Sequence, residues 1–171
     1  MSAETRSWSE RLTSTSASDQ ASALQEMAEQ TELRGYTAAV VRLAGCRDDE
    51  VRRWAAELLE VAIAPVASDV EELADLLAGG EEGEVCYWAA TMLGRLGPDV
   101  APKTRVAVDA LEICLGDSLY LPARERAAWA LSQIGPSAAS AAITLRRTAE
   151  DAPPRLQRLV AEALEMIGEA A

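Results

Sequence analysis

One pattern of apolar and polar residues recurs along the chain. In EVRRWAAELLEVA, residues 50–62, the side chains of Val51, Ala55 and Leu59 share one face of a helix, because successive residues are separated by about 100°. Arginines and glutamates occupy the other face. The stretch EVCYWAATMLGRL, residues 84–96, repeats V-x-x-W-A-A-x-[LM]-L 34 positions later. The pattern therefore predicts an amphipathic helix that occurs more than once.

Helix-stopping residues recur with a similar period. Gly97-Pro98 and Gly135-Pro136 each follow a repeated helix. Glycine can adopt the left-handed cap conformation and proline cannot continue the helical hydrogen bonding, so each pair ends a helix. Between such stops the pattern predicts second helices at 36–44, 69–78, 103–115 and 137–149. The repeating unit is therefore a helix, a tight turn, a second helix and a short acidic loop, with a period of 33 to 38 residues.

The repeats have a recognisable sequence motif. It is clearest in DDEVRRWAAELL, EVCYWAATMLGRLG, RERAAWALSQIG and QRLVAEALEMIG. These stretches resemble the HEAT-repeat family, in particular the short HEAT-like repeats of phycobilisome bilin lyases. The resemblance implies an all-α fold, a right-handed α-solenoid (superhelix) of about four to five helical hairpins that stack and cover one another. It also implies polar contacts between repeats through an arginine that Arg52 and Arg124 match. Cys86 and Gln157 stand at that position in the other two copies, where we expect the contact to be broken.

The two ends of the chain differ from the repeats. Residues 1–17, MSAETRSWSERLTSTSA, are rich in Ser and Thr and are expected to form a flexible tail, with Trp8 disordered. Residues 18–171 are expected to form a single repeat domain, in which Ser18 or Asp19 caps the first helix. We expect that helix and the next to pair as an N-terminal cap, and the last helix to be half a repeat.

Composition excludes several kinds of chemistry. The chain has no His, which removes Ser-His and Cys-His catalytic pairs and every His-based metal site, and it has no Gly-rich phosphate loop. We therefore expect that the protein is not an enzyme and has no catalytic, metal or cofactor site. Cys46, Cys86 and Cys114 are odd in number and far apart, so they are expected to be buried or half-buried free thiols in a reducing compartment.

The net charge of −12 restricts the possible partners. Phosphate backbones and anionic membrane surfaces repel such a chain, so neither nucleic acid nor a membrane is expected to bind it. There is no secretory signal and no apolar run of about 20 residues, so we expect a cytoplasmic location. An acidic run over residues 69–84 is most simply solvated surface, and alternatively a docking patch for a basic partner.

Second helices are the usual binding surface of HEAT-like solenoids, on the concave side. The polar positions expected there are Arg42, Glu72, Asp75, Arg105, Asp109, Glu112, Thr144 and Arg147. Two aromatic residues are further candidates for partner contact. Trp129 lies off the core stripe, where it either anchors a partner or packs against Leu145 or the last helix. Tyr87 takes an outward position.

The last third of the chain contains a basic cluster. Its members are Arg124, Arg126, Arg146, Arg147, Arg155 and Arg158. They either pair with nearby carboxylates of the same chain or form one pole of a dipolar surface that orients a partner or drives self-association.

These features favour a non-enzymatic binding or scaffold module with another protein as its partner, one candidate being a protein with a basic patch. A monomer is favoured. Two alternatives stay open. An enzyme or chromophore-handling subunit resembling a bilin lyase predicts a deep apolar cleft with convergent polar groups. A self-assembling structural subunit predicts a mass above the monomer's 18.2 kDa.

Overall fold

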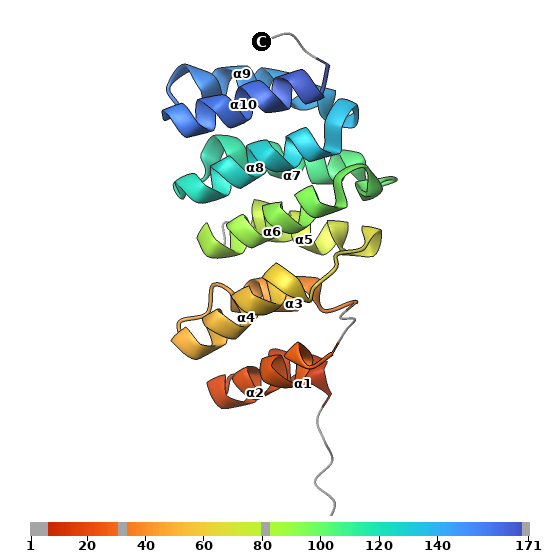
Figure 1. The fold of residues 1–171 in the computed structure, drawn as a ribbon, viewed down its shortest axis with the longest axis vertical. Helices are drawn as coiled ribbons and strands as arrows, with labels where there is room; N and C mark the ends of the chain where they lie inside the picture. The colour runs from red at the N-terminus through yellow and green to blue at the C-terminus, as the bar shows by residue number, and fades with distance from the viewer. Residues whose placement is uncertain (1–6, 31–33, 80–82, 169–171) are drawn as a thin grey trace, which may run out of the picture. The chain divides into compact units, whose positions relative to one another are not determined.

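The regular structure consists of helices throughout the part of the chain that is described. The computed structural model describes residues 7–30, 34–79 and 83–168 (Figure 1). Within those ranges every regular element is an α-helix or a short 3-10 helix. The predicted all-α fold is confirmed.

The chain forms two compact units, residues 1–64 and residues 65–171. The first contains α1 (Trp8–Leu12), α2 (Ala17–Ala28), α3 (Thr37–Leu43) and α4 (Asp49–Val61). The α-helices of the second are α5 (Val70–Ala78), α6 (Gly83–Leu96), α7 (Thr104–Asp117), α8 (Leu121–Ile134), α9 (Ala142–Glu150) and α10 (Pro154–Met166). Its 3-10 helices are η1 (Ala67–Asp69), η2 (Gly97–Val100) and η3 (Gly135–Ala141).

Each unit is a stack of helical hairpins. In the second unit α5 packs against α6, α7 against α8, and α9 against α10. The layer of α6, α8 and α10 lies in front of the layer of α5, α7 and α9 in Figure 1. We call α6, α8 and α10 the first-helix layer and α5, α7 and α9 the second-helix layer, after their order in the predicted repeat unit and not in the observed hairpins. In the first unit α1 packs against α2 and α3 against α4.

The sequence pattern therefore assigned each helix to the wrong hairpin partner. The sequence pattern paired each first helix with the helix after its Gly-Pro turn, which left the last helix as half a repeat. In the structure α10 completes a hairpin with α9, and α2 pairs with α1 instead of α3. The Gly-Pro turns carry the chain from α6 to α7 and from α8 to α9, that is, from one hairpin to the next. The loops from α3 to α4, from α7 to α8 and from α9 to α10 each join the two helices of one hairpin.

Both glycines of the Gly-Pro turns have a positive φ, as the sequence predicted for glycines that end helices. Gly97 has φ of 52° and Gly135 has φ of 71°, in the left-handed region that glycine reaches without strain. A 3-10 helix begins at each of these glycines. For this reason α9 begins at Ala142, whereas the sequence pattern placed the start of that helix at residue 137.

The N-terminal segment has more structure than the sequence indicated. Residues 1–6 of the predicted tail lie outside the described residues. Ser7 and Glu10 form a capping box that begins α1. Trp8 donates from Nε1 to Glu26 on α2 at 3.4 Å, and its ring meets that of Tyr36 edge-on at 5.6 Å. Trp8 is thus docked on the first unit, contrary to the prediction of disorder.

Two further contacts complete the start of the first unit. Arg11 donates to both carboxylate oxygens of Glu26, at 2.6 and 2.9 Å, and these hydrogen bonds hold the pKa of Glu26 below its ordinary value. The cap of α2 is Ser16, whose side chain accepts from the backbone N–H of Asp19. The predicted caps, Ser18 and Asp19, lie inside the helix, because Ser16, whose backbone is extended, is the last residue before it.

One side-chain position ties the start of a helix to a backbone carbonyl of the preceding helix or of the loop after that helix. Arg52 donates to the Cys46 carbonyl at 2.9 Å, and Arg124 donates to the Leu115 carbonyl at 2.8 Å. Gln157 occupies the same position on α10 and donates to the carbonyl of Ala149 at 3.1 Å. The expectation that the contact is broken at Gln157 is therefore wrong, since an amide donor can replace a guanidinium donor here.

Replacing Arg124 with alanine is expected to lower the free energy of unfolding by about 1 kcal/mol, because the Leu115 carbonyl loses a part-buried donor. Arg124→Gln is expected to retain most of the stability, since Gln157 shows that glutamine reaches the equivalent carbonyl. Urea denaturation followed by circular dichroism measures both variants. Equal losses for the two substitutions would show that the hydrogen bond is not what matters at this position.

The core consists mainly of leucine and alanine side chains, with valine, isoleucine and methionine among them. Trp88 is 6% exposed, whereas Trp54 is only half-buried, so the two tryptophans that the motif aligns are not equivalent. Cys86 and Cys114 are buried and Cys46 is half-buried, and all three are free thiols, as predicted.

Candidate functional site

The exposed side of α5, α7 and α9 is the first candidate surface, and we call it the second-helix face. It carries the predicted polar positions Glu72, Asp75, Arg105, Asp109, Glu112, Thr144 and Arg147. The remaining predicted position, Arg42, is exposed on α3 in the other unit. The acidic run that drew attention to this region is only partly on the face. Asp69 is buried and accepts from the Val66 backbone N–H, and residues 81 and 82 lie outside the described residues.

Ion pairs on the second-helix face are open to solvent. Arg105 Nε lies 3.5 Å from Asp109 Oδ2, and the two side chains are 92% and 57% exposed, so the pair adds little stability. Lys103 Nζ lies 3.2 Å from Glu71 Oε2 and connects α7 to α5. An incoming cation could therefore replace Arg105 at Asp109 at small cost.

Two contacts bring predicted residues of α7 and α9 together. Thr144 Oγ1 donates to Glu112 Oε1 at 2.6 Å. Arg147 lies beside Gly116, with Nη2 3.7 Å from the place that a β-carbon would take. The Glu112 carboxylate is thus engaged within the protein. The more exposed acids of this face are Glu72, Asp75 and Asp109.

A hollow on the second-helix face lies between α7 and η3. Its volume is about 600 Å³, and it is lined by Thr104, Arg105, Val108, Asp109, Ser137 and Ser140. The sequence pattern did not indicate it, because η3 was predicted to be the beginning of an α-helix. The 3-10 turn places two serine side chains opposite the polar side of α7. Hydroxyl groups and a carboxylate therefore line one concavity.

A second candidate surface lies on the first-helix layer. The guanidinium of Arg126 on α8 lies 5.0 Å from the Tyr87 ring centre and 5.3 Å from that of Trp129. Arg126 Nη2 also donates to the Tyr87 hydroxyl at 2.8 Å. The structure thus joins the two aromatic candidates through Arg126, which the sequence analysis named only as one of six arginines in the basic cluster. The sequence did not indicate this contact, because Arg126 and Tyr87 belong to different helices.

Trp129 is half-buried, and its ring packs over Gly94 on α6. A methyl group at Gly94 would come closer than 3.0 Å to that ring. Neither predicted environment, Leu145 or the last helix, describes this contact. A glycine in the middle of a helix is the signal that could have indicated it, since glycine there often allows close packing by a neighbour.

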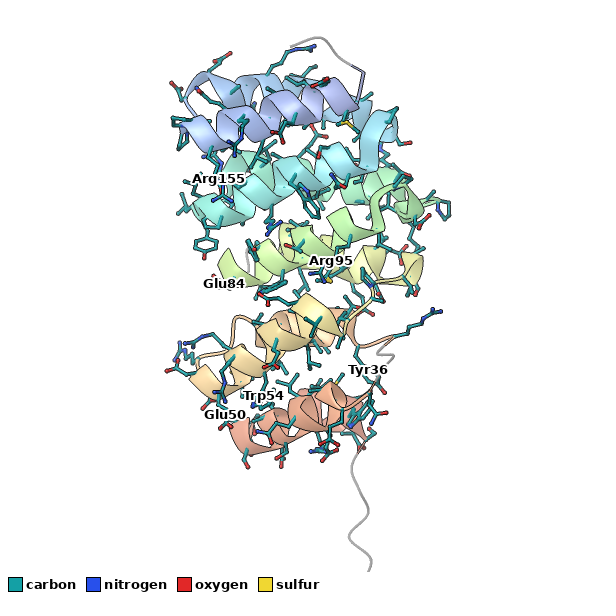
Figure 2. All side chains as sticks on the ribbon, in the orientation of Figure 1. Tyr36, Glu50, Trp54, Glu84, Arg95 and Arg155 are labelled. Atoms are coloured by element: carbon teal, nitrogen blue, oxygen red, sulfur yellow. The ribbon has the colours of Figure 1, made fainter. Side chains whose placement is uncertain are left out.

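A pocket of about 270 Å³ adjoins the two rings. It is lined by Tyr87, Pro122, Glu125, Arg126, Trp129, Arg155 and Leu159. Arg155 on α10 lies toward the same end of the layer as Glu84 on α6 (Figure 2). Arg155 Nε lies 3.3 Å from Glu125 Oε2, and the Glu125 side chain is only 11% exposed.

The basic cluster of the last third is largely engaged within the chain. Arg155 pairs with Glu125, and Arg158 lies 3.8 Å from Glu162. Arg124 binds a backbone carbonyl. Internal pairing thus accounts for much of the cluster, and Arg126 differs from these three because it contacts aromatic rings.

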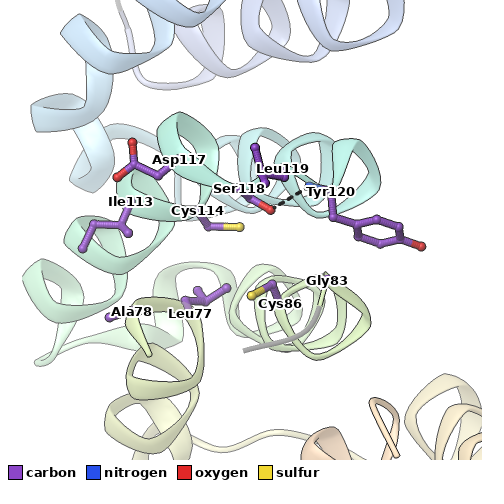
Figure 3. Close-up of a pocket in the computed structure, with 10 residues that line it drawn as sticks. All are labelled: Leu77, Ala78, Gly83, Cys86, Ile113, Cys114, Asp117, Ser118, Leu119 and Tyr120. Atoms are coloured by element: carbon purple, nitrogen blue, oxygen red, sulfur yellow. Dashed lines mark hydrogen bonds between the residues drawn. The ribbon is translucent and has the colours of Figure 1, made fainter. Parts of the chain in front are cut away.

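A third concavity has a volume of about 460 Å³ and contains two thiols. Cys86 and Cys114 line it together with Leu77, Ile113 and Leu119, and Figure 3 shows Tyr120 pointing away from the two sulfur atoms. The hydrogen bond with Cys86, together with burial, raises the pKa of the Cys114 thiol. That thiol is therefore protonated at neutral pH and is a weak nucleophile.

The Tyr120 hydroxyl donates to Glu84 Oε1, and this hydrogen bond raises the pKa of Tyr120 to about 12. The folded pKa exceeds the unfolded value of about 10, so the contribution to stability is complete below pH 10 and is lost as the pH rises toward 12. Ultraviolet titration of phenolate is expected to show one tyrosine that ionises near pH 12. Glu84→Gln should return it toward the ordinary range, and an unchanged titration curve would contradict the assignment.

Two classes of site are absent from the described ranges. No group of three or more His, Cys, Asp or Glu side chains there could hold a metal ion. No helix among the described residues is long and apolar enough to cross a membrane.

Comparisons with known proteins identify the fold. No protein-family model and no curated protein matches the sequence. An engineered protein from the Northeast Structural Genomics Consortium matches with a TM-score of 0.62 and 23% identity, over 94% of this chain and 77% of that one. A designed armadillo repeat protein in complex with the peptide (KR)4 matches with a TM-score of 0.61 and 16% identity, over 94% and 80%. These likenesses show the fold alone, and the predicted α-solenoid of helical repeats is confirmed.

Proposed function

We propose that the chain is a non-enzymatic, HEAT-like protein-binding module that holds a basic segment of a partner protein on its second-helix face. The observation that carries the proposal is the combination of exposed acids with the adjoining hollow. Glu72, Asp75 and Asp109 are exposed on neighbouring helices, and the hollow begins at Asp109.

Electrostatics favours a cationic segment at this face. Exposed carboxylates on α5 and α7 produce a local negative potential, and the net charge of −12 extends it. A lysine or arginine of a partner can form charge-assisted hydrogen bonds with Asp109 and the serine hydroxyls in the hollow. Complementary charge mainly raises the association rate and fixes the register of the partner.

The structural comparisons support a peptide-like occupant. The designed armadillo repeat protein with a similar fold was solved with (KR)4, a peptide of alternating lysine and arginine. Stacked helical hairpins offer an extended surface on which a chain of repeated charge can lie. We extend the inference to this chain because its second-helix face carries exposed acids on two consecutive hairpins, Glu72 and Asp75 on α5 and Asp109 on α7.

The remaining expectations belong to the same proposal. We infer a monomer in the cytoplasm, with the second-helix face on the concave side and no cofactor. A chromophore-handling subunit resembling a bilin lyase would need a reactive group in a deep apolar cleft. The thiol-lined concavity is the nearest match, but its Cys114 thiol is held protonated.

Affinity capture from the native cell extract tests the proposal. The bait is the full chain, and the comparison is Glu72→Lys/Asp75→Lys/Asp109→Lys. The control, Glu57→Lys/Glu162→Lys/Glu165→Lys, reverses three exposed acids on first helices and has the same net charge. We expect a partner with a basic segment to bind the wild type and the control and to be lost from the second-helix variant.

Mass spectrometry identifies the captured protein, and the purified pair is then measured directly. A partner lost from both variants to the same extent would mean that net charge, and not the second-helix face, is responsible. A partner retained by both would refute the proposed face.

A further inference from the structure

The pocket beside Tyr87 and Trp129 has a charge opposite to that of the protein as a whole. Its charged side chains are Arg126, Arg155 and Glu125. Glu125 is largely buried and pairs with Arg155 at 3.3 Å, which neutralises both. Arg126 therefore leaves the pocket with one positive charge in excess. This charge stands out in a chain with a net charge of −12.

The Arg126 guanidinium is held by rings and not by a carboxylate. It lies 5.0 Å from the Tyr87 ring centre and 5.3 Å from that of Trp129. Among the described residues no carboxylate forms an ion pair with it. Its hydrogen bond within the protein is the one from Nη2 to the Tyr87 hydroxyl, although a guanidinium has five N–H donors.

This arrangement fits a carboxylate. The two rings and the Tyr87 hydroxyl hold the planar fork of Arg126 in place before any ligand arrives, so little side-chain entropy is lost on binding. A guanidinium binds a carboxylate through two parallel hydrogen bonds along one edge. The aromatic rings can cover the methylene groups of an aspartate or glutamate side chain.

The volume of the pocket limits the size of the group that can enter it. Its volume of about 270 Å³ is below the range of about 300–1,000 Å³ that is typical of small-molecule sites. It is open on the solvent side of the first-helix layer and is lined by three helices, α6, α8 and α10, so that one side chain of an extended segment can enter it.

We propose that this carboxylate pocket, made by Tyr87, Arg126, Trp129 and the Glu125–Arg155 pair, binds an acidic side chain from a peptide segment of a partner protein. The site is on the layer opposite the second-helix face and takes the opposite charge, so it does not depend on the function proposed above. A module with both sites could hold a basic segment on one layer and an acidic segment on the other.

Nuclear magnetic resonance of the ¹⁵N-labelled full chain tests this inference. The indole N–H signal of Trp129, assigned with Trp129→Phe, is followed during titration with a short capped peptide of alternating Glu and Gly. The same peptide with Gln in place of Glu is the ligand control. We expect a saturable shift of the Trp129 signal with the Glu peptide and none with the Gln peptide.

Substitutions then locate the binding. Arg126→Gln is expected to lower the affinity for the Glu peptide by at least about tenfold. Arg126→Lys is expected to lower it by less, because lysine keeps the charge but lacks the planar fork of donors. Arg105→Gln, which removes an exposed arginine on the second-helix layer, is expected to leave the affinity unchanged. Should Arg126→Gln fail to fold, Arg155→Gln removes one positive charge from the same pocket and is also expected to weaken binding.

Several results would overturn the proposal. One is an equal affinity of the wild type and Arg126→Gln for the Glu peptide. Another is equal binding of the Glu and Gln peptides to the wild type. A third is a shift of the Trp129 signal with inorganic phosphate but not with the Glu peptide, which would indicate a simple anion site. Analytical ultracentrifugation of the wild type without a ligand can give one further contradicting result. A dimer that Arg126→Gln abolishes would make a second copy of this acidic chain the occupant instead of a partner protein.

Discussion

Replacing Trp88 with alanine is expected to lower the free energy of unfolding by about 3–5 kcal/mol, the usual cost of removing a large buried aromatic side chain. Trp88 is 6% exposed, and its ring meets that of Tyr87 edge-on at 5.3 Å. The substitution removes the buried apolar surface of the indole. It also leaves a cavity beside α6, a helix that packs against both α5 and α8. Urea denaturation followed by circular dichroism gives the loss.

Trp54→Ala is the comparison, and a smaller loss is expected. The Trp54 ring is half-buried, and the described residues provide no hydrogen-bond acceptor for its buried Nε1. Trp54→Phe removes that unsatisfied donor and is expected to be nearly neutral. A loss below about 1 kcal/mol for Trp88→Ala, or a greater loss for Trp54→Ala, would contradict the burial of the two rings described above.

Gly94→Ala is expected to destabilise the protein, although the same change in an unobstructed helix stabilises it by about 0.5–1 kcal/mol. The added methyl group would come closer than 3.0 Å to the Trp129 ring, so the ring must move. Overpacking of this kind costs about 1–3 kcal/mol, which exceeds the gain in helix propensity. Displacing Trp129 also removes one wall of the carboxylate pocket.

Gly116→Ala is the matched control in α7. A methyl group there would meet only Arg147 Nη2 at an ordinary 3.7 Å, so we expect stabilisation by about 0.5–1 kcal/mol. Thermal and urea denaturation report the sign of each change, and the assigned indole N–H signal of Trp129 reports the movement of the ring. If Gly94→Ala stabilised the protein as Gly116→Ala does, Trp129 would not pack over Gly94.

Local rules account for much of the fold. The spacing of Val51, Ala55 and Leu59 predicted a helix with one apolar face, and α4 buries all three. The left-handed glycines at 97 and 135 lie where helix-stopping pairs were recognised. Such features depend on neighbours within one or two turns of helix, so the sequence displays them directly.

The pairing of helices could not be obtained in the same way. Each helix of a solenoid has neighbours before and after it, and the apolar pattern is compatible with either as its hairpin partner. The contacts of Arg124 and Gln157 with carbonyls of the preceding helix show which loop closes a hairpin. For α1, the signal was present in Ser7 and Glu10, a capping-box spacing within a segment that composition alone marks as a tail.

For the candidate sites too, the sequence placed residues on a surface but did not show most of the contacts between helices. Glu112 and Thr144 were both predicted to lie on the second-helix face, and the structure joins them by a hydrogen bond. Tyr87 and Trp129 were predicted separately. Arg126, which brings them together, is one of several arginines in its region, and its role depends on a helix 39 residues away in the sequence. The hollow at η3 depends on a 3-10 turn that α-helical periodicity does not distinguish.

The central claim is that the second-helix face binds a basic segment. Calorimetric titration of the full chain with a short capped peptide of alternating lysine and arginine, at physiological ionic strength, tests it most directly. We expect saturable binding to the wild type and to Glu57→Lys/Glu162→Lys/Glu165→Lys, and at least about a tenfold loss in Glu72→Lys/Asp75→Lys/Asp109→Lys. No binding to the wild type, or equal affinities in the two variants, would contradict the claim.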